Sequence, residues 1–240
     1  MLAVVGAVLW FLLDDPAARG PLIKGKPVAY WTRQLLHPVP PYPDAMSTLA
    51  NEKSVAIPAL VHQLSLPDVA AKDFAKKLWL WLPGPLQARV PAPITRAELR
   101  AGAVLALAMI YEPLTIHTHA PSRPSLSEAQ IMLPALTKAL QDREAVVRIF
   151  AAGALGSLAV ISTQAIDSCD AALKDPNWNV RANAVSSLGR LALTDEQAIP
   201  RLKSALSDSD AQVRKTATDA LKGLGKVPQQ KDASSATEVK

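Results

Sequence analysis

Cysteine is almost absent from this chain of 240 residues, which contains Cys169 alone. A single thiol excludes an internal disulfide and the paired-cysteine arrangements of zinc and redox sites. The sequence also lacks glycine-rich phosphate-binding loops, the HExxH zinc motif, the GxSxG nucleophile motif and any paired-carboxylate arrangement. It therefore offers no recognisable catalytic set, and we expect neither a cofactor nor a metal.

Aromatic residues are also scarce, at 5% of a chain that is 49% hydrophobic. The apolar residues are therefore mostly Ala, Leu, Val and Ile, whose small and unbranched members favour closely packed helices over a β-sandwich. Twenty prolines against ten glycines indicate many helix boundaries, because proline is tolerated at a helix start and breaks a helix interior. The composition predicts an all-α protein.

Charge is not concentrated on any one segment. The net charge is +5, yet residues 127–224 contain 11 basic and 11 acidic residues, and no basic run is visible. A nucleic-acid interface needs clustered lysine and arginine on one surface. The pattern therefore argues against nucleic acid as a partner.

Three segments of the C-terminal half align without a gap, starting at IMLPAL, AIDSCD and AIPRLK. A Val-Arg pair recurs with a period of 33 residues, and an aspartate precedes each pair at the same spacing. The pairs and aspartates are Val147-Arg148, Val180-Arg181 and Val213-Arg214, with Asp142, Asp175 and Asp208. So many positions in phase are typical of a repeat architecture.

Each repeat contains two stretches of apolar residues at helical spacing, separated by a polar turn. In that turn Asp210 and Asn177 are suited to cap the second helix, whereas Glu144 at the matching position is a poor cap. A helical hairpin of this size cannot bury its apolar faces alone and must stack on its neighbours. The sequence predicts an α-solenoid.

Upstream of these units the repeats are irregular. Residues 98–107 match the second helix of a unit, with Leu99-Arg100 in the place of the Val-Arg pair, and further helices are predicted at 28–36, 44–51 and 69–82. Residues 111–127 are rich in Pro, Ser, Thr and His and predict an inserted loop. The expected organisation is a hydrophobic leader or anchor (1–13), a Pro-rich linker with one short helix (14–43), the solenoid (44–224) and a disordered tail (225–240).

The pattern L-x-D-x-x-x-x-V-R-x-x-A-x-x-x-L resembles the HEAT-like repeats of the bacterial, phycobilisome-lyase-like kind. Their following glycine is present as Gly156 and Gly189, and Lys222 replaces it in the third unit. The upstream stretch is similar to a bacterial subfamily in which a hydrophobic leader precedes Gly-Lys-Pro-x-x-x-Trp, here residues 25–31, and in which a Trp-Leu-Pro stretch, here residues 81–83, precedes regular repeats. This resemblance assigns no activity. For such arrays it implies a non-catalytic scaffold that binds another protein.

Two other classes of function stay open at this stage. Some HEAT-like proteins are enzymes, either chromophore lyases or DNA-repair glycosylases, but a glycosylase needs a basic concave face and the repeats balance to zero net charge. The other class is a purely structural spacer without a specific ligand.

The repeated acidic and basic residues form a candidate ladder, made of Asp142, Arg148, Asp175, Arg181, Asp208 and Arg214. The ladder could line a charged groove for a ligand, or it could hold the repeats together. Regular repetition favours the structural role, because a functional site usually needs one special constellation. We expect each turn aspartate to accept hydrogen bonds from backbone amides and from an arginine of its own or the next repeat.

Six other residues attract attention. Trp178 stands where the other units have alanine, so it either anchors a partner or covers the adjacent repeat. Trp79 and Trp81, beside two lysines, suit a membrane surface, although one of them should face the core because alternate residues of a helix point to different faces. Cys169 lies on an inward stripe and is expected to be buried and inert. His117 and His119 are interpreted as part of a plain loop.

Residues 2–13 (LAVVGAVLWFLL) form an uncharged apolar run. The run is shorter than the about 20 residues that span a bilayer, but it has the length of the hydrophobic region of a signal peptide. No basic residue precedes it, so a buried first helix in a cytoplasmic protein is the competing interpretation. We expect a membrane-anchored or exported protein, because the run is apolar on every side.

Overall fold

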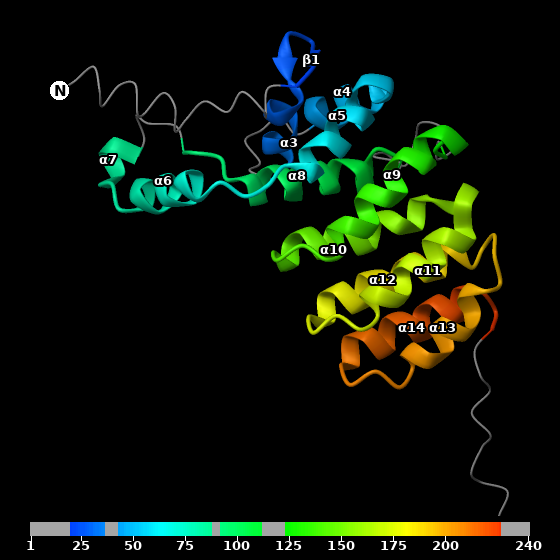
Figure 1. Cartoon of the computed structure of the whole chain (residues 1–240). Helices are drawn as coiled ribbons and strands as arrows, with labels where there is room; N and C mark the ends of the chain where they lie inside the picture. Colours follow the sequence, from blue (N-terminus) through cyan, green and yellow to red (C-terminus); the bar gives the residue numbers. More distant parts are fainter. Residues whose placement is uncertain (1–19, 37–42, 88–91, 112–122, 227–240) are drawn as a thin grey trace, which may run out of the picture.

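Twelve α-helices dominate the part of the chain that the structure describes, which comprises residues 20–36, 43–87, 92–111 and 123–226. Within those residues this computed structural model contains one small sheet, the antiparallel pair β1 (Leu22–Ile23) and β2 (Lys26–Pro27). The predicted all-α solenoid is confirmed (Figure 1). The helices are α3 (Val28–Leu36), α4 (Pro43–Asn51), α5 (Lys53–Ser65), α6 (Ala70–Leu80), α7 (Gly84–Gln87), α8 (Arg96–Met109), α9 (Leu126–Ala139), α10 (Ala145–Ala154), α11 (Ser162–Ala172), α12 (Trp178–Leu191), α13 (Ala198–Ala205) and α14 (Ala211–Gly223).

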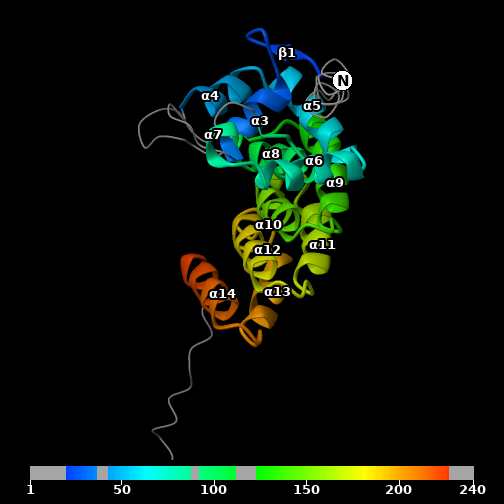
Figure 2. The same cartoon turned by 90° about the vertical axis from the view of Figure 1, so that its left-hand side faces the viewer.

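The helices form two layers. Helices α8, α10, α12 and α14 pack each against the next, and we call them the Val-Arg layer after the residue pair of α10, α12 and α14, which is Leu99-Arg100 in α8. The first helices of the regular hairpins, α9, α11 and α13, lie on the other side, and α5 packs against both α8 and α9 (Figure 2). Each hairpin thus buries its apolar stripe against its own partner helix and against the neighbouring hairpins.

The residues that repeat with the 33-residue period form the core. Their side chains are completely buried in all three regular units: Val147, Val180 and Val213; Ala151, Ala184 and Ala217; Leu155, Leu188 and Leu221; and, on the first helices, Leu136, Cys169 and Leu202. Alanine in the middle of each second helix lets the helices of the Val-Arg layer approach closely. The larger side chains then fill the space between the layers.

The helix starts follow the turn chemistry of the sequence. Asp210 accepts hydrogen bonds from the amides of Gln212 and Val213, and Asn177 accepts one from the amide of Asn179. Glu144 occupies the same position in the first unit without a side-chain cap. The predicted difference between these caps is confirmed. The loop expected at 111–127 ends sooner than predicted, because Ser125 caps α9.

Helix α3 extends the Val-Arg layer at its N-terminal end by packing against α8. Its residues Val28 and Thr32 are buried, and Trp31 donates a hydrogen bond from its indole nitrogen to the carbonyl of Ile23. The two helices meet at Gly102, where an added Cβ would lie 2.9 Å from the carbonyl oxygen of Thr32. The short helix predicted at 28–36 is confirmed as α3, and its apolar side chains pack against the core.

An insertion separates the two helices of the first upstream unit. Between α5 and α8 the chain runs through α6 and α7, and we call residues 67–87 the arm. Figure 1 shows the arm leaving the stack of helices at the end of α8. The sequence predicted a helix here but not that it projects from the stack.

The predicted leader (1–13) lies outside the described residues, as do residues 227–240 of the predicted tail. Among the helices that the structure describes, none is both long and apolar enough to cross a bilayer.

Candidate functional site

The repeated aspartates and arginines meet between adjacent repeats. Arg148 donates two parallel hydrogen bonds to the carboxylate of Asp175, from Nε to Oδ2 at 2.7 Å and from Nη2 to Oδ1 at 3.2 Å. Arg181 holds Asp208 in the same way, at 2.8 and 2.9 Å. Such a fork fixes orientation as well as distance, because both groups are planar. Each fork locks one repeat onto the next.

The same arginines also bind their own turns. The Nη1 atom of Arg181 donates to the carbonyl of Asp175 at 2.9 Å, and Oδ1 of Asp175 accepts from the amide of Asn177 at 2.8 Å. The aspartate thus receives its arginine from the preceding repeat, and not from its own or the next repeat as expected. The reason is that the arginine side chain points along the stack from the turn it caps.

Arg100 continues this ladder into the irregular region. Its Nε donates to Oδ2 of Asp142 at 2.6 Å, and its Nη1 donates to Asp68 at 2.7 Å. The sequence signal for this position was the Leu99-Arg100 pair, although our candidate set did not include Arg100. At the other end, Arg214 donates to the carbonyls of Asp208 and Ser209, and no carboxylate among the described residues forks onto it.

The forks change the acidity of the ladder. Hydrogen bonds from the Arg181 guanidinium outweigh the cost of burial and hold the pKa of Asp208 below its ordinary value. For Asp175, burial opposes ionisation, yet hydrogen bonds from Arg148 and from the Asn177 amide lower the pKa overall. These carboxylates are ionised and fully engaged at neutral pH, which fits a structural role.

Trp178 and Cys169 differ sharply in their surroundings. Trp178 is the first residue of α12 and is 41% exposed beside the turn that contains Asp175; its role in partner contact stays a prediction. Cys169 is completely buried, and burial raises the pKa of its thiol to about 12. An un-ionised, inaccessible thiol is neither a nucleophile nor a ready metal ligand.

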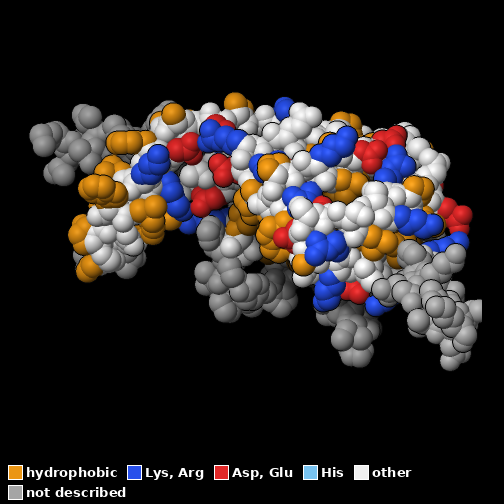
Figure 3. All heavy atoms as spheres, turned by 90° about the horizontal axis from the view of Figure 1, so that it is seen from below, with side chains coloured by type: hydrophobic (Ala, Val, Ile, Leu, Met, Phe, Trp, Pro, Cys, Tyr) orange, Lys and Arg blue, Asp and Glu red, His pale blue; other side chains and the backbone are white. Residues whose placement is uncertain are grey.

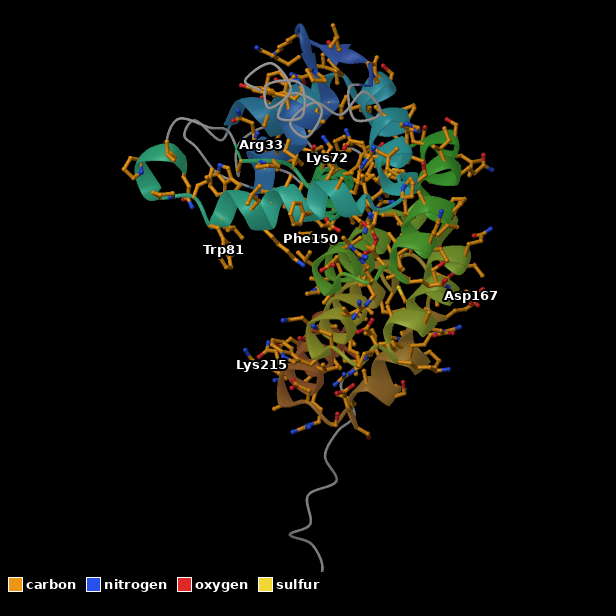
Figure 4. All side chains as sticks on the ribbon, turned by 60° about the vertical axis from the view of Figure 1, so that its left-hand side comes forward. Arg33, Lys72, Trp81, Phe150, Asp167 and Lys215 are labelled. Atoms are coloured by element: carbon orange, nitrogen blue, oxygen red, sulfur yellow. The ribbon has the colours of Figure 1, made fainter. Side chains whose placement is uncertain are left out.

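A groove lies between the arm and the Val-Arg layer. It consists of two adjoining cavities of about 240 and 550 Å³, which share Leu36, Lys76 and Glu98 in their walls. The smaller cavity reaches Trp79, and the larger one is open and extends to Val146 on α10. Figure 4 shows Arg33 of α3 and Phe150 of α10 on opposite sides of the arm. We call these joined cavities the arm groove.

Several charged residues around the arm groove form ion pairs, whereas Lys77 in its wall is exposed. Lys76 donates to Glu98 at 3.1 Å, and Arg143 contacts Asp68 at 3.0 Å and Asp73 at 3.3 Å. These pairs tie the base of the arm to α8 and to the turn before α10. The groove therefore has apolar walls at Leu36 and Val146 and a rim that carries both acidic and basic side chains.

The outer side of the arm is apolar; the sequence singled out Trp81 as suited to a membrane surface, but not the other side chains of this surface. Its exposed side chains are Phe74, Leu78, Leu80, Trp81 and Leu86. Figure 3 shows hydrophobic side chains gathered at the end of the molecule where the arm lies. A signal was present in the uncharged stretch LWLWLPGPLQA of residues 78–88. Of the two tryptophans there, Trp79 lines the arm groove, whereas Trp81 is exposed.

Metal ligation finds no support in the described residues. No group of three or more His, Cys, Asp or Glu side chains among them is arranged to hold an ion. His117 and His119 lie outside the described residues.

Comparison with known proteins identifies the repeats. A family model described as HEAT repeats matches residues 133–231, which run from within the first in-phase unit to beyond the third and exclude the arm. No curated protein matches the chain.

Solved structures with related folds are distant. One is the crystal structure of an engineered protein, 19% identical, with a TM-score of 0.38; the match covers 95% of this chain and 60% of the engineered one. Another is human deoxyhypusine hydroxylase in complex with glycerol, 16% identical, with a TM-score of 0.35, covering 92% of this chain and 95% of the hydroxylase. At TM-scores this low, neither likeness carries an argument about activity.

Proposed function

We propose that this chain is a non-catalytic scaffold of HEAT type that binds another protein in the arm groove. The observation that carries this proposal is the groove itself, an open space of about 550 Å³ with apolar walls and a rim of paired charges. That combination suits an amphipathic segment, whose apolar side would contact Leu36 and Val146 while its polar side meets the rim.

The state of the charged groups around the groove also supports binding over catalysis. Lys76 and Glu98 neutralise each other, and Arg143 is held by two aspartates. A general acid or base needs a proton that it can give or accept, and paired ions at neutral pH are poorly suited to that role. A glycosylase-like enzyme would need a free basic face, which this mixed rim does not supply.

The experiment compares two exposed apolar residues on opposite layers. Val146 is 42% exposed in the arm groove, and Ile131 is 46% exposed on α9. The variants Val146→Glu and Ile131→Glu would each be used to capture proteins from the native cell, and mass spectrometry would quantify what they retain. We expect Val146→Glu to lose specific partners and Ile131→Glu to keep them, with unchanged far-UV circular dichroism for both. Equal capture by the two variants would favour the spacer alternative.

We further propose that residues 2–13 hold the scaffold at a membrane or direct its export. The support is the uncharged apolar sequence of this run, with Asp14, Asp15 and Pro16 directly after it. Cells expressing the full chain would be fractionated beside cells expressing a version that begins at Asp14. We expect only the full chain in the membrane or exported fraction. Recovery of both in the cytoplasm with equal stability would contradict the proposal.

A further inference from the structure

The arm presents its largest side chains to solvent. Phe74 is 64% exposed, Leu78 is 54% exposed and Trp81 is 88% exposed, whereas Lys72 and Ala75 on the opposite side of α6 are buried. A surface helix of a soluble protein normally shows the reverse arrangement, with its apolar side chains turned inward. The arm is therefore shaped to meet an apolar phase.

These side chains surround the end of the arm on more than one face. Phe74, Leu78 and Trp81 follow the spacing of a single helix face, but Leu80, at 59% exposure, points elsewhere on the helix, and Leu86 is exposed on α7. Figure 4 shows Trp81 at the end of α6, directed away from the stack of helices. A folded protein partner covers one face of a helix. A fluid bilayer surrounds a projecting tip on all sides.

The end of the arm is uncharged, and the charged residues of the arm lie nearer the stack of helices, as expected of a segment that enters a bilayer. Residues 78–88 contain no charged residue. Two lysines precede this stretch, on the side nearer the stack of helices. Lys77 is exposed, and the ammonium of Lys76 lies 5.8 Å from the centre of the Trp79 ring. The acid of this helix, Asp73, is paired with Arg143. The apolar tip thus matches the acyl region, and the exposed Lys77 matches the level of anionic headgroups, whereas Lys76 is paired with Glu98.

We propose that the tip of the arm inserts into the interfacial region of a lipid bilayer, with a preference for anionic lipid. This contact is separate from the arm groove and from any anchoring by residues 2–13. That apolar run is separated from Gly20 by six residues, which span at most about 20 Å. A leader held in a bilayer would therefore keep Gly20 within about 20 Å of the same membrane.

The test places a polarity-sensitive fluorophore on the arm in the full chain. Trp81→Cys supplies the labelling thiol, and Leu193→Cys is the matched control, because Leu193 is 72% exposed in the polar C-terminal half. Cys169 is buried and un-ionised, so it will not compete for the label. The labelled proteins are mixed with phosphatidylcholine vesicles, with and without about one third phosphatidylglycerol.

We expect the emission at position 81 to shift to the blue on mixing with vesicles, more strongly with phosphatidylglycerol, and the emission at position 193 to stay unchanged. Two results overturn the proposal. One is vesicle binding without a shift at position 81, which would assign the contact to the leader. The other is a blue shift that appears without vesicles and grows with protein concentration, which would assign the tip to a second copy of the chain.

A second measurement separates the arm from the leader. In full chain whose leader is made polar by Val5→Asp and Leu9→Asp, we expect the combined change Leu78→Ser and Trp81→Ser to lower vesicle partitioning at least about tenfold. Leu193→Ser should leave it unchanged. Equal partitioning of the combined arm variant and the Leu193→Ser control would contradict insertion by the tip.

Discussion

The regular repeats after Leu126 and the region before Tyr111 both stack helical hairpins, but the connections between the two helices of a hairpin differ greatly in length. In the regular units a few residues join the two helices, as between α13 and α14, whereas the arm separates α5 from α8. Yet Arg100 forks onto Asp142 as Arg148 forks onto Asp175. Stacking therefore depends on buried helix faces and on the arginine fork, and it tolerates a long insertion in the turn.

The two regions also differ in the surface that they present. Along the Val-Arg layer, Val146 and Phe150 of α10 are followed 33 residues later by Asn179 and Asn183 of α12. The apolar surface thus fades toward the C-terminus, where the last repeat ends the array with a polar face. Binding functions are expected to concentrate where the repeats are irregular.

The largest expected effect tests whether the regions form one cooperative unit. Leu188→Ala in α12 and Leu107→Ala in α8 each remove a completely buried side chain, and each should lower the free energy of unfolding by about 2–5 kcal/mol. Lys203→Ala, at an exposed position, is the control. Urea denaturation should show a single transition for all three. Two transitions, with each leucine variant moving only one, would show that the regions unfold independently.

The next effect tests whether α3 is part of the stack. Gly102→Ala would bring a methyl group against the backbone of Thr32, and we expect a loss of about 1–3 kcal/mol. Gly223→Ala, at a position in α14 with open space around it, should be neutral or slightly stabilising. If both variants unfold at the same urea concentration, the contact between α3 and α8 contributes nothing to stability.

Comparison of two arginines isolates the contact between repeats. Arg181 and Arg214 both bind the carbonyls of their own turns, but only Arg181 forks onto a carboxylate in the described structure. Arg181→Ala should therefore cost about 1–2 kcal/mol more than Arg214→Ala. Urea midpoints of the two variants measure the difference. Equal losses would mean that the fork contributes no net stability.

Lowering the pH should remove the contribution of the Arg181–Asp208 contact to the free energy of unfolding. The pKa of Asp208 is lower in the folded protein than in the unfolded chain, so the stabilisation is complete above the unfolded value, about 4, and declines as pH falls through the folded value. The stability gap between the native chain and Arg181→Ala should be constant from pH 7 to about pH 5 and narrow below about pH 4. A gap that does not change with pH would contradict the link to Asp208.

The smallest expected effect concerns the arm. Trp81→Ala removes a large side chain that is 88% exposed, and we expect a change of less than about 0.5 kcal/mol in the free energy of unfolding. Thermal melting beside Leu188→Ala measures the contrast. A large loss would show that Trp81 is packed in solution and unavailable to a membrane.

The regular half could be predicted closely from sequence, because the residues that repeat every 33 positions are also the residues that are buried. The Val, Ala and Leu positions in phase are the core, and Asp210 caps its helix as its position in the turn suggested. The arm groove could not be predicted, because it depends on where α6 lies relative to α3 and α10. The helix at 28–36 could be predicted from its sequence, but its packing against α8 could not, because the sequence of a short helix does not show which neighbour it contacts.

The position of the arm has a consequence for engineering. It occupies a turn between helices whose stacking contacts are supplied by α5, α8 and Arg100, and not by the arm's own backbone. Residues 78–87, which lie beyond the ion pairs of Asp68, Asp73 and Lys76, should therefore be exchangeable for a short turn or for an unrelated domain without a change in helix register. The stack of helices would then be a scaffold that accepts different inserted segments at this turn.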